Sequence, residues 1–478
     1  MKRIFRFLLI LSAVLPYSTF AQLNQKHRVV ILTDIENEPD DTQSLIRLLL
    51  YSNMIDIKGL IATTSTHLRT SIHPEAIRKI ITAYGEVYQN LSKHEAGFPT
   101  AATLLSKIKK GLPEYGMQSV GDNKDTEGSD WIIKILEEND DRPLWISVWG
   151  GVNTLAQTLY KINKTKPHAE IKKLVAKLRV YTISDQDDSG IWIRKNFPEL
   201  FYIVSPGSYG SATWIAITTQ ASGLNNEKIS NKWLAENIQQ RHGPLGSLYP
   251  DVAYGMEGDT PSWLSLIKNG LNEPEHPEWG GWGGRYLLYK PEAASIDKNG
   301  FTGGVPIEPE SRPIWTNTSD RYEPYIVSDY GRTIRRDTAV ITGNKATIWR
   351  WRDDFQNDFA ARMDWCTKSY RDANHPPVPA LNHPDRFTVK SGEEFFLDAK
   401  GSTDPDGDNL SYLWFNYPEA GSYNKPIYTV SAENICKVRV IAPVVAKTEI
   451  VHFILKVTDK GTPQLTRYKR VLVTILPK

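Results

Sequence analysis

Short apolar runs alternate with segments of helical spacing along the first half of the chain. The runs typical of buried strands are residues 29–32, 57–64, 144–149, 178–183 and 200–204. The segments whose apolar residues fall on one face of a helix are residues 45–50, 73–84 and 131–136. Strands separated by helices predict an α/β fold, with a mostly parallel sheet and helices on both faces. In such a sheet the ligand site lies beyond the carboxyl ends of the strands.

The second half of the chain changes character twice. Residues 243–330 are rich in Gly, Pro and Trp and show weak periodicity, so we expect long loops that lie over the site. Segments 346–351 and 355–366 close the first domain, and a proline-rich stretch then indicates a stiff linker. Short strand-like runs follow at residues 395–399, 410–414, 437–441, 450–457 and 470–475. Their spacing predicts an all-β, immunoglobulin-like sandwich.

The N-terminus has the features of a secretory signal peptide. Basic residues within positions 1–6 precede an apolar stretch at 7–15, and small residues follow at Thr19 and Ala21. The apolar stretch is too short to span a bilayer. We therefore predict a secreted or periplasmic protein. The expected division is a signal peptide at residues 1–21, a first domain at 22–368, a linker at 369–384 and the sandwich at 385–478.

Composition and charge narrow the choice of partners. Of the 478 residues, 40% are hydrophobic and 23% are charged, as in ordinary soluble proteins. The signal peptide carries three basic residues, so its removal leaves 57 − 3 = 54 bases against 55 acids, a formal charge of −1. This balance gives no reason to expect nucleic acid or an anionic membrane as a partner. The sequence leaves open whether Cys366 and Cys436 pair, and whether the chain forms a homo-oligomer.

The most unusual stretch is the eight-residue segment from Asp34 to Asp41, in which five residues are acidic. It lies between the first predicted strand and the first predicted helix. Asp40 and Asp41 are explained if they cap the helix, but Asp34, Glu36 and Glu38 are not. Carboxylates crowded into one turn repel one another unless a positive charge lies among them. A hard cation with oxygen ligands is the simplest such charge.

This segment resembles the N-terminal signature of the nucleoside hydrolases, Asp-x-Asp-x-Gly-x-Asp-Asp. The resemblance implies that Asp40 and Asp41 bind Ca²⁺, that Glu36 is the catalytic base, and that Asp34 is a supporting acid. Glu36 stands where the family has aspartate, and Glu38 stands where it has glycine. The Glu-Asn-Glu-Pro-Asp-Asp form is similar to that of a secreted branch of nucleoside hydrolase-like proteins. That branch often has a C-terminal domain of a carbohydrate-binding type.

Two further segments are similar to metal-binding parts of that family. Residues 150–156 resemble a loop in which a backbone carbonyl ligates the metal, and Asn153 stands at that position. Residues 257–261 match the distal metal-binding aspartate at Asp259. The family commonly has a leaving-group histidine just before this aspartate, where this chain has Gly258. The proton donor is therefore open among His67, His276 and Arg285, for each of which a structural role is the alternative.

Several polar and aromatic residues are candidates for substrate binding. Asp185, Asp187 and Asp188 follow a predicted strand, and their carboxylates can accept hydrogen bonds from sugar hydroxyls or cap a helix. The remaining candidates are Glu38, Thr66, His67, Trp279 and Trp282. The two tryptophans lie among glycines, which favours exposed rings that stack on sugars, although burial in a core is the alternative.

These residues support one chemical hypothesis and one alternative. A calcium ion held by Asp40, Asp41, Asp259 and the carbonyl of Asn153 would orient water and bind vicinal hydroxyls, while Glu36 accepts the proton of the attacking water. Substrates would be N-ribosyl or O-linked pentosyl or furanosyl compounds, from nucleosides to polysaccharides. The alternative is a non-catalytic polysaccharide-binding protein with a degenerate hydrolase domain. The turn Asp404-Pro405-Asp406-Gly407-Asp408 is similar to PKD-type modules and is either a solvated turn or a second calcium site.

Overall fold

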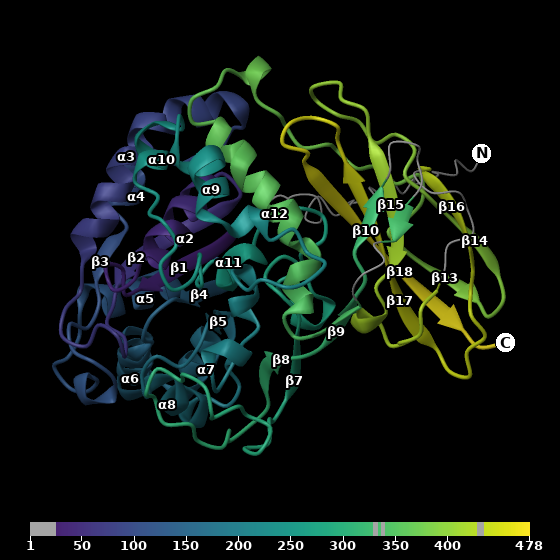
Figure 1. The fold of residues 1–478 in the computed structure, drawn as a ribbon. Coiled ribbons are helices and arrows are strands. Elements are labelled where there is room, and N and C mark those ends of the chain that lie inside the picture. The colour runs from purple at the N-terminus through teal and green to yellow at the C-terminus, as the bar shows by residue number, and fades with distance from the viewer. Residues whose placement is uncertain (1–24, 328–332, 336–339, 428–434) are drawn as a thin grey trace, which may run out of the picture.

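The computed structural model describes residues 25–327, 333–335, 340–427 and 435–478 (Figure 1). The predicted signal peptide at residues 1–21 lies outside them. In the described part of the chain, no helix is both long and apolar enough to cross a membrane.

An eight-stranded sheet forms the centre of the first domain, in the order β3-β2-β1-β4-β5-β6-β8-β7. Its strands are β1 (His27–Thr33), β2 (Ile55–Ala62), β3 (Ile108–Lys110), β4 (Leu144–Val148), β5 (Leu178–Thr182), β6 (Phe201–Val204), β7 (Tyr286–Tyr289) and β8 (Ile314–Asn317). Neighbouring strands are parallel except β7 and β8, which are antiparallel. The predicted mostly parallel sheet is confirmed.

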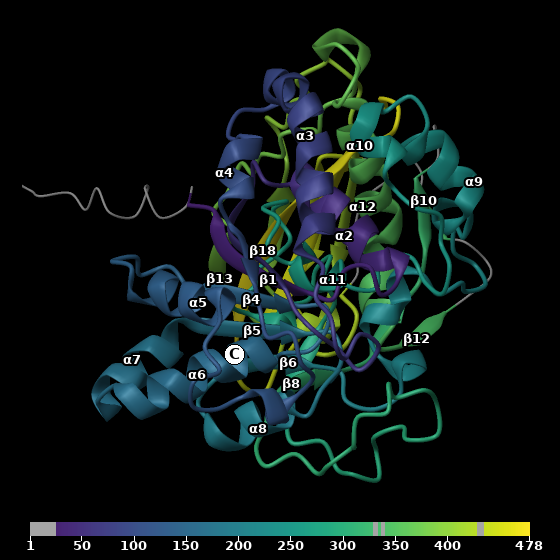
Figure 2. The same ribbon diagram turned by 90° about the vertical axis from the view of Figure 1, so that its left-hand side faces the viewer.

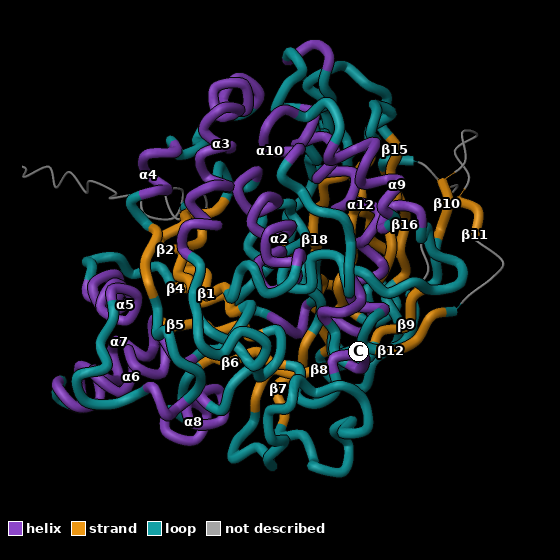
Figure 3. Tube along the Cα trace, turned by 60° about the vertical axis from the view of Figure 1, so that its left-hand side comes forward, coloured by secondary structure: helices purple, strands orange, loops and turns teal. Residues whose placement is uncertain are grey.

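Helices cover both faces of this sheet, as predicted (Figures 2 and 3). One face carries α2 (Pro39–Leu50), α3 (Pro74–His94), α4 (Ala101–Leu105), α10 (Gly243–Ser247) and α12 (Ala346–Asp364); the other carries α5 (Glu127–Glu137), α6 (Asn153–Thr165), α7 (His168–Lys177) and α8 (Ser189–Asn196). Alternate residues of β1 serve the two cores. Val29 and Ile31 pack with α2 and α3, whereas Val30 and Leu32 pack with α5 and α6. Successive side chains of a strand point to opposite faces, so both neighbours of a doubly covered strand are apolar.

The segment predicted as long loops contains short elements. These are α10, α11 (Pro261–Leu264), β7, β8, β9 (Asp320–Tyr322) and β10 (Tyr325–Val327); β10 pairs with β11 (Thr333–Arg335), and β9 pairs with β12 (Ile341–Gly343). Short helical segments between β6 and β7 include α9 (Asn231–Leu234) and the single turns Tyr209–Ser211, Trp214–Ile217 and Pro277–Trp279. The two apolar segments expected at 346–351 and 355–366 belong to one helix, α12.

The C-terminal part is the predicted antiparallel, strand-rich sandwich. Its strands are β13 (Arg386–Lys390), β14 (Glu394–Asp398), β15 (Ser411–Asn416), β16 (Lys437–Ile441), β17 (Glu449–Thr458) and β18 (Thr466–Leu476). They form a four-stranded sheet, β13-β18-β17-β15, and a two-stranded sheet, β14-β16. Among the strands described in the sandwich, only β13 and β18 pair in parallel.

The sandwich and the first domain share a buried interface along α12 (Figure 1). The Trp351 ring lies 5.6 Å from that of Tyr468 and 6.2 Å from that of Phe415, both of the sandwich. Asp358 of α12 forms an ion pair of 2.6 Å with Arg467 of β18, and both side chains are buried. This packing makes the two parts one body rather than separate modules on a flexible linker. Cys366 and Cys436 are both free, with Cys366 buried against the first core.

Candidate metal and active site

The carboxyl ends of four parallel strands meet at one edge of the large sheet. Thr33 of β1 pairs with Ala62 of β2, and Val148 of β4 pairs with both Leu32 and Thr182. The acidic turn at 34–38, the loop after β2, the loop after β4 and the loop after β5 therefore leave the sheet at the same level. The sequence motifs predicted for the site follow these strands, as expected for a parallel sheet.

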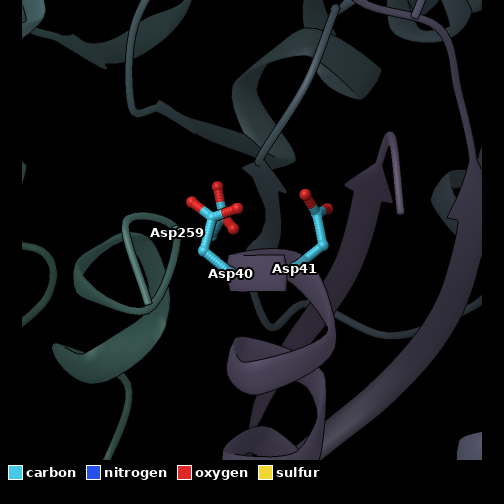
Figure 4. Close-up of side chains that lie close together, drawn as sticks. All are labelled: Asp40, Asp41 and Asp259. Carbon is cyan, nitrogen blue, oxygen red and sulfur yellow. The ribbon is translucent and has the colours of Figure 1, made fainter. Parts of the chain in front are cut away.

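Three aspartates converge at this edge (Figure 4). Asp40 and Asp41 project from the first turn of α2, and Asp259 comes from the turn before α11. One carboxylate oxygen of each lies within 4.8 Å of the others. Asp41 and Asp259 are buried, and Asp40 is partly exposed. The structure thus brings together three of the four predicted metal ligands.

The pKa values of the clustered aspartates are raised, as expected for buried carboxylates that repel one another. Burial, followed by the charges of Glu38 and Asp34, raises the pKa of Asp40 to about 7. Burial and the charges of Asp40, Asp41, Asp34 and Glu38 raise the pKa of Asp259 well above its usual value. The Oδ2 atom of Asp259 is buried and has no hydrogen-bond partner within the described structure. A buried, unpartnered carboxylate oxygen is unfavourable unless a cation binds it.

The guanidinium of Arg47, below the cluster on α2, is already neutralised. Arg47 Nε lies 2.7 Å from Glu257 Oε2, and both side chains are fully buried. Glu257 also accepts hydrogen bonds from the hydroxyls of Tyr249 and Thr260, at 2.6 and 2.9 Å. This pair fixes the loop that carries Asp259 but contributes no net charge to the aspartates.

Two glycines allow the loop after β4 to approach the acids. A Cβ atom added at Gly150 would lie 2.5 Å from Oδ1 of Asp34, and one at Gly151 would lie 2.5 Å from Oδ2 of Asp187. Asp187 accepts hydrogen bonds from the backbone amides of Asn153 and Ser189, at 3.1 and 2.9 Å. Asp187 therefore orders the loop, which is a different contribution from the sugar contact predicted for it.

The side chain of Asn153 points away from the cluster. Its amide nitrogen donates to the carbonyl of Glu114 at 2.7 Å and to Thr64 Oγ1 at 3.1 Å, and its oxygen accepts from Thr63 at 3.1 Å. Only the backbone carbonyl of Asn153 is thus left for the ligand role that the family resemblance implies.

The acids of the opening turn occupy different environments. Asp34 is buried, and burial raises its pKa although Ser65 and His67 lower it. Glu38 precedes α2, and its charge raises the pKa values of the three clustered aspartates. Glu36 is exposed, and its backbone has a left-handed φ of 80°. The predicted base therefore lies on the solvent side of the turn, whereas Glu38 and Asp34 lie closer to the aspartates.

An aromatic wall, made of His67, Tyr209, Trp214 and Phe301, borders the acids. A Cβ atom at Gly258 would lie 3.0 Å from the Trp214 ring and 2.9 Å from Asp40, so Trp214 occupies the space next to the position where the family has histidine. The Tyr209 ring packs edge-on against Trp214 and against Phe301. His67 Nε2 lies 3.3 Å from the Tyr209 hydroxyl, and its ring stacks on Phe301. Sequence reasoning found only His67 of these four.

Other predicted residues have structural partners. Asp185 forms a two-pronged ion pair with Arg194, both contacts at 2.8 Å, and Asp188 accepts a hydrogen bond from the amide of Met117. Thr66 donates to the carbonyl of Gly303, which joins the loop after β2 to the segment carrying Phe301.

The two tryptophans differ from the prediction of exposed sugar-stacking rings. Trp282 has no exposed surface and lies between Phe355 of α12 and Tyr468 of β18. The Trp279 ring stacks on His276 and meets His452 of β17 edge-on, at the domain interface. The sandwich packs against this loop. The glycines of the loop predicted exposed rings because the sequence does not show that a second domain lies there.

Of the three candidate proton donors, only His67 lies at the acidic centre. His276 stacks on Trp279 at the domain interface and contacts Glu278 at 3.0 Å. Arg285 forms a buried ion pair of 2.6 Å with Asp320.

Comparisons with known proteins give a family for each part of the chain. The model of the family described as "Cellulose-binding Sde182, nucleoside hydrolase-like domain" matches residues 28–286. That of "Cellulose-binding protein Sde0182, C-terminal domain" matches residues 394–475. Among curated proteins there is no match.

Solved structures give the same indication. A nucleoside hydrolase-related hypothetical protein from Saccharophagus degradans, described as associated with carbohydrate metabolism, is 35% identical with a TM-score of 0.78. The match covers 94% of this chain and 100% of that one. The effector protein XOO4466 is 9% identical over 61% of this chain and 87% of its own, with a TM-score of 0.31, too low to support an argument.

Proposed function

Because the chain belongs to the family of cellulose-binding Sde182 proteins with a nucleoside hydrolase-like domain, we propose that it is a secreted, calcium-dependent hydrolase of glycosyl bonds. Its substrates would be N-ribosyl or O-linked pentosyl or furanosyl compounds. The observation that carries this proposal is the convergence of Asp40, Asp41 and Asp259, with the buried Oδ2 of Asp259 unpartnered in the described structure.

The donor set fits a hard divalent cation. The three carboxylates and the backbone carbonyl of Asn153 would supply oxygen ligands only, which is the preference of Ca²⁺. When bound, the ion would supply positive charge that orients a water molecule and vicinal sugar hydroxyls. Asp34, held against Gly150, keeps further negative charge beside this position.

The remaining chemistry falls to the opening turn and the aromatic wall. Glu36 accepts the proton of the attacking water, as the resemblance implies, and water attack in a single displacement inverts the anomeric carbon. Glu38 lies nearer the aspartates and binds substrate hydroxyls. His67, whose Nε2 is 3.3 Å from the Tyr209 hydroxyl, protonates the leaving group in place of the histidine absent at Gly258.

The alternative is a polysaccharide-binding protein without turnover. The family description of residues 394–475 as part of a cellulose-binding protein favours it, as does the exposed position of Glu36. In either case we propose residues 1–21 as a signal peptide, 22–368 as the hydrolase-like domain, 369–384 as the linker and 385–478 as the sandwich.

Substrate panels separate the two functions. The mature chain would be assayed on nucleosides and on aryl furanosides with calcium present, beside Glu36→Gln and Glu38→Gln. Turnover lost in Glu36→Gln, with Glu38→Gln changing mainly KM, supports the hydrolase and its base. Turnover that is retained in Glu36→Gln but lost in Glu38→Gln would identify Glu38 as the base instead. Absence of turnover on both panels, with retention on cellulose, favours the binding protein.

A further inference from the structure

A cavity lies between the two domains, away from the acidic centre. Its volume is about 440 Å³, within the range of about 300–1,000 Å³ of small-molecule sites. Tyr322 of β9 and Trp351 of α12 line it from the first domain, and Phe415 of β15 and Glu419 line it from the sandwich. Figure 1 shows α12 and β9 facing the sandwich strands around this place.

The floor of the cavity is apolar and held by its neighbours. Leu413 and Phe415 alternate along β15 with Trp414, which points into the sandwich core, so the first two face the first domain. Both are partly exposed. The Phe415 ring lies 6.2 Å from the buried Trp351 ring, which also packs edge-on against Tyr468. A rigid aromatic floor can bind the apolar face of a ring at little cost in side-chain entropy.

The charges at the cavity are compensated within the protein. Arg350 lies 3.3 Å from Asp320 and 3.9 Å from Glu419, and Lys456 pairs with Asp354 at 2.7 Å. An anionic ligand such as a phosphate needs a cation that no carboxylate already neutralises. The balance of charge therefore favours a neutral ligand.

Two lining residues also have buried polar atoms that form no hydrogen bond with the residues described. Glu419 Oε1 accepts from the amide of Arg321 at 2.9 Å, whereas its Oε2 has no such partner and lies 3.9 Å from Arg350. The indole N–H of Trp351 is likewise without an acceptor there. Buried polar atoms are normally paired, so each such atom requires an explanation.

We propose that this interdomain cavity binds a short neutral saccharide. Aromatic rings would contact the sugar face, while the carboxylate of Glu419 and the guanidinium of Arg350 hydrogen-bond to hydroxyl groups. The cavity shares no residue with the acidic cluster, so binding here does not depend on hydrolysis there. Because both domains contribute, an occupied cavity strengthens the interface along α12.

The test is calorimetric titration of the full mature chain with soluble β-1,4-linked glucose oligosaccharides, in the Glu36→Gln background to exclude turnover. Glu419→Gln keeps the side-chain shape but removes the charge, and Phe415→Ala removes the aromatic floor. Phe396→Ala, an exposed aromatic of β14 on the other sandwich sheet, is the matched control. Urea denaturation of each variant identifies any loss of folding.

We expect saturable binding that weakens at least about tenfold in Glu419→Gln and in Phe415→Ala and is unchanged in Phe396→Ala. Inorganic phosphate should not displace the saccharide. Binding equal in all variants, displacement by phosphate, or no saturable binding to the folded chain would each overturn the proposal. Because the titration uses a chain without the predicted base, neither result bears on hydrolysis at the acidic cluster.

Discussion

Replacing Asp259 with asparagine should have opposite effects on stability without and with calcium. In the metal-free protein the substitution removes a buried negative charge whose Oδ2 has no hydrogen-bond partner in the described structure. The neighbouring Asp40 sets the scale. Its pKa is raised from 3.8 to about 7, and at about 1.4 kcal/mol per unit the ionised form costs about 4 kcal/mol of stability at pH 8. We expect Asp259→Asn to stabilise the metal-free chain by roughly 1–4 kcal/mol.

The sign of this effect depends on pH. A carboxyl group whose folded-state pKa is raised lowers stability as the pH rises through that pKa. Through these carboxyl groups the metal-free wild type should lose stability as the pH rises from 4 to 8, and the advantage of Asp259→Asn should disappear near pH 4. With calcium at about a hundred times its Kd, the wild type gains about 2.7 kcal/mol, whereas the variant, which lacks a ligand, gains much less.

Urea denaturation in chelator and in saturating calcium measures the free energy of unfolding of both proteins and shows whether the sign of the difference changes. Asp141→Asn, the loss of an exposed acid, is the control and should leave both curves unchanged. An Asp259→Asn variant that is less stable than the wild type in chelator at pH 8 would refute the reasoning. So would an equal calcium response in the two proteins.

Three other outcomes test separate parts of the account. Glu36→Gln should lower turnover at least about a hundredfold and leave calcium affinity unchanged, because Glu36 lies outside the aspartate cluster; a parallel loss of calcium binding contradicts this. Asp358→Asn should destabilise the chain by about 3–5 kcal/mol in urea, because buried Arg467 loses its partner across the domain interface; a change below about 1 kcal/mol would mean that the interface contributes little. Burial and Arg470 lower the pKa of His452 from 6.5 to about 3, so the unfolded state takes up a proton that the folded state does not. Stability should fall by about 2 kcal/mol through this residue between pH 7 and pH 5, and His452→Gln should lack that part of the slope.

The strands of the large sheet that sequence patterning predicts are those buried on both faces. Residues 29–32 are a continuous apolar run, and residues 144–149 are apolar except for Ser147, because helices cover both sides of β1 and β4. The pattern fails at the sheet edges. β3 at Ile108–Lys110 is short and partly polar, and β7 at Tyr286–Tyr289 exposes three of its four residues, so neither has the signal of a buried strand.

The candidate site can be predicted from the sequence where its functional residues lie in one segment. Five acids within eight residues indicate a cation without any knowledge of the fold, and the family resemblance adds Asp259. Tyr209, Trp214 and Phe301 could not be predicted from the sequence, because they lie in single helical turns and a loop and meet only in three dimensions. The burial of Trp282 could not be predicted for the same reason, since it packs against Tyr468, which lies 186 residues further along the chain.

The most direct test of the central claim is calcium-dependent turnover by the purified mature chain. Calcium would be removed by dialysis against chelator and restored stepwise, with bound ion and hydrolysis of nucleosides and aryl furanosides measured on the same samples. We predict that hydrolysis by the wild type returns in proportion to the calcium that it binds, and that Asp259→Asn binds less calcium under the same conditions. Hydrolysis that is equal in chelator and in calcium, or calcium bound to the same extent by Asp259→Asn, would contradict it.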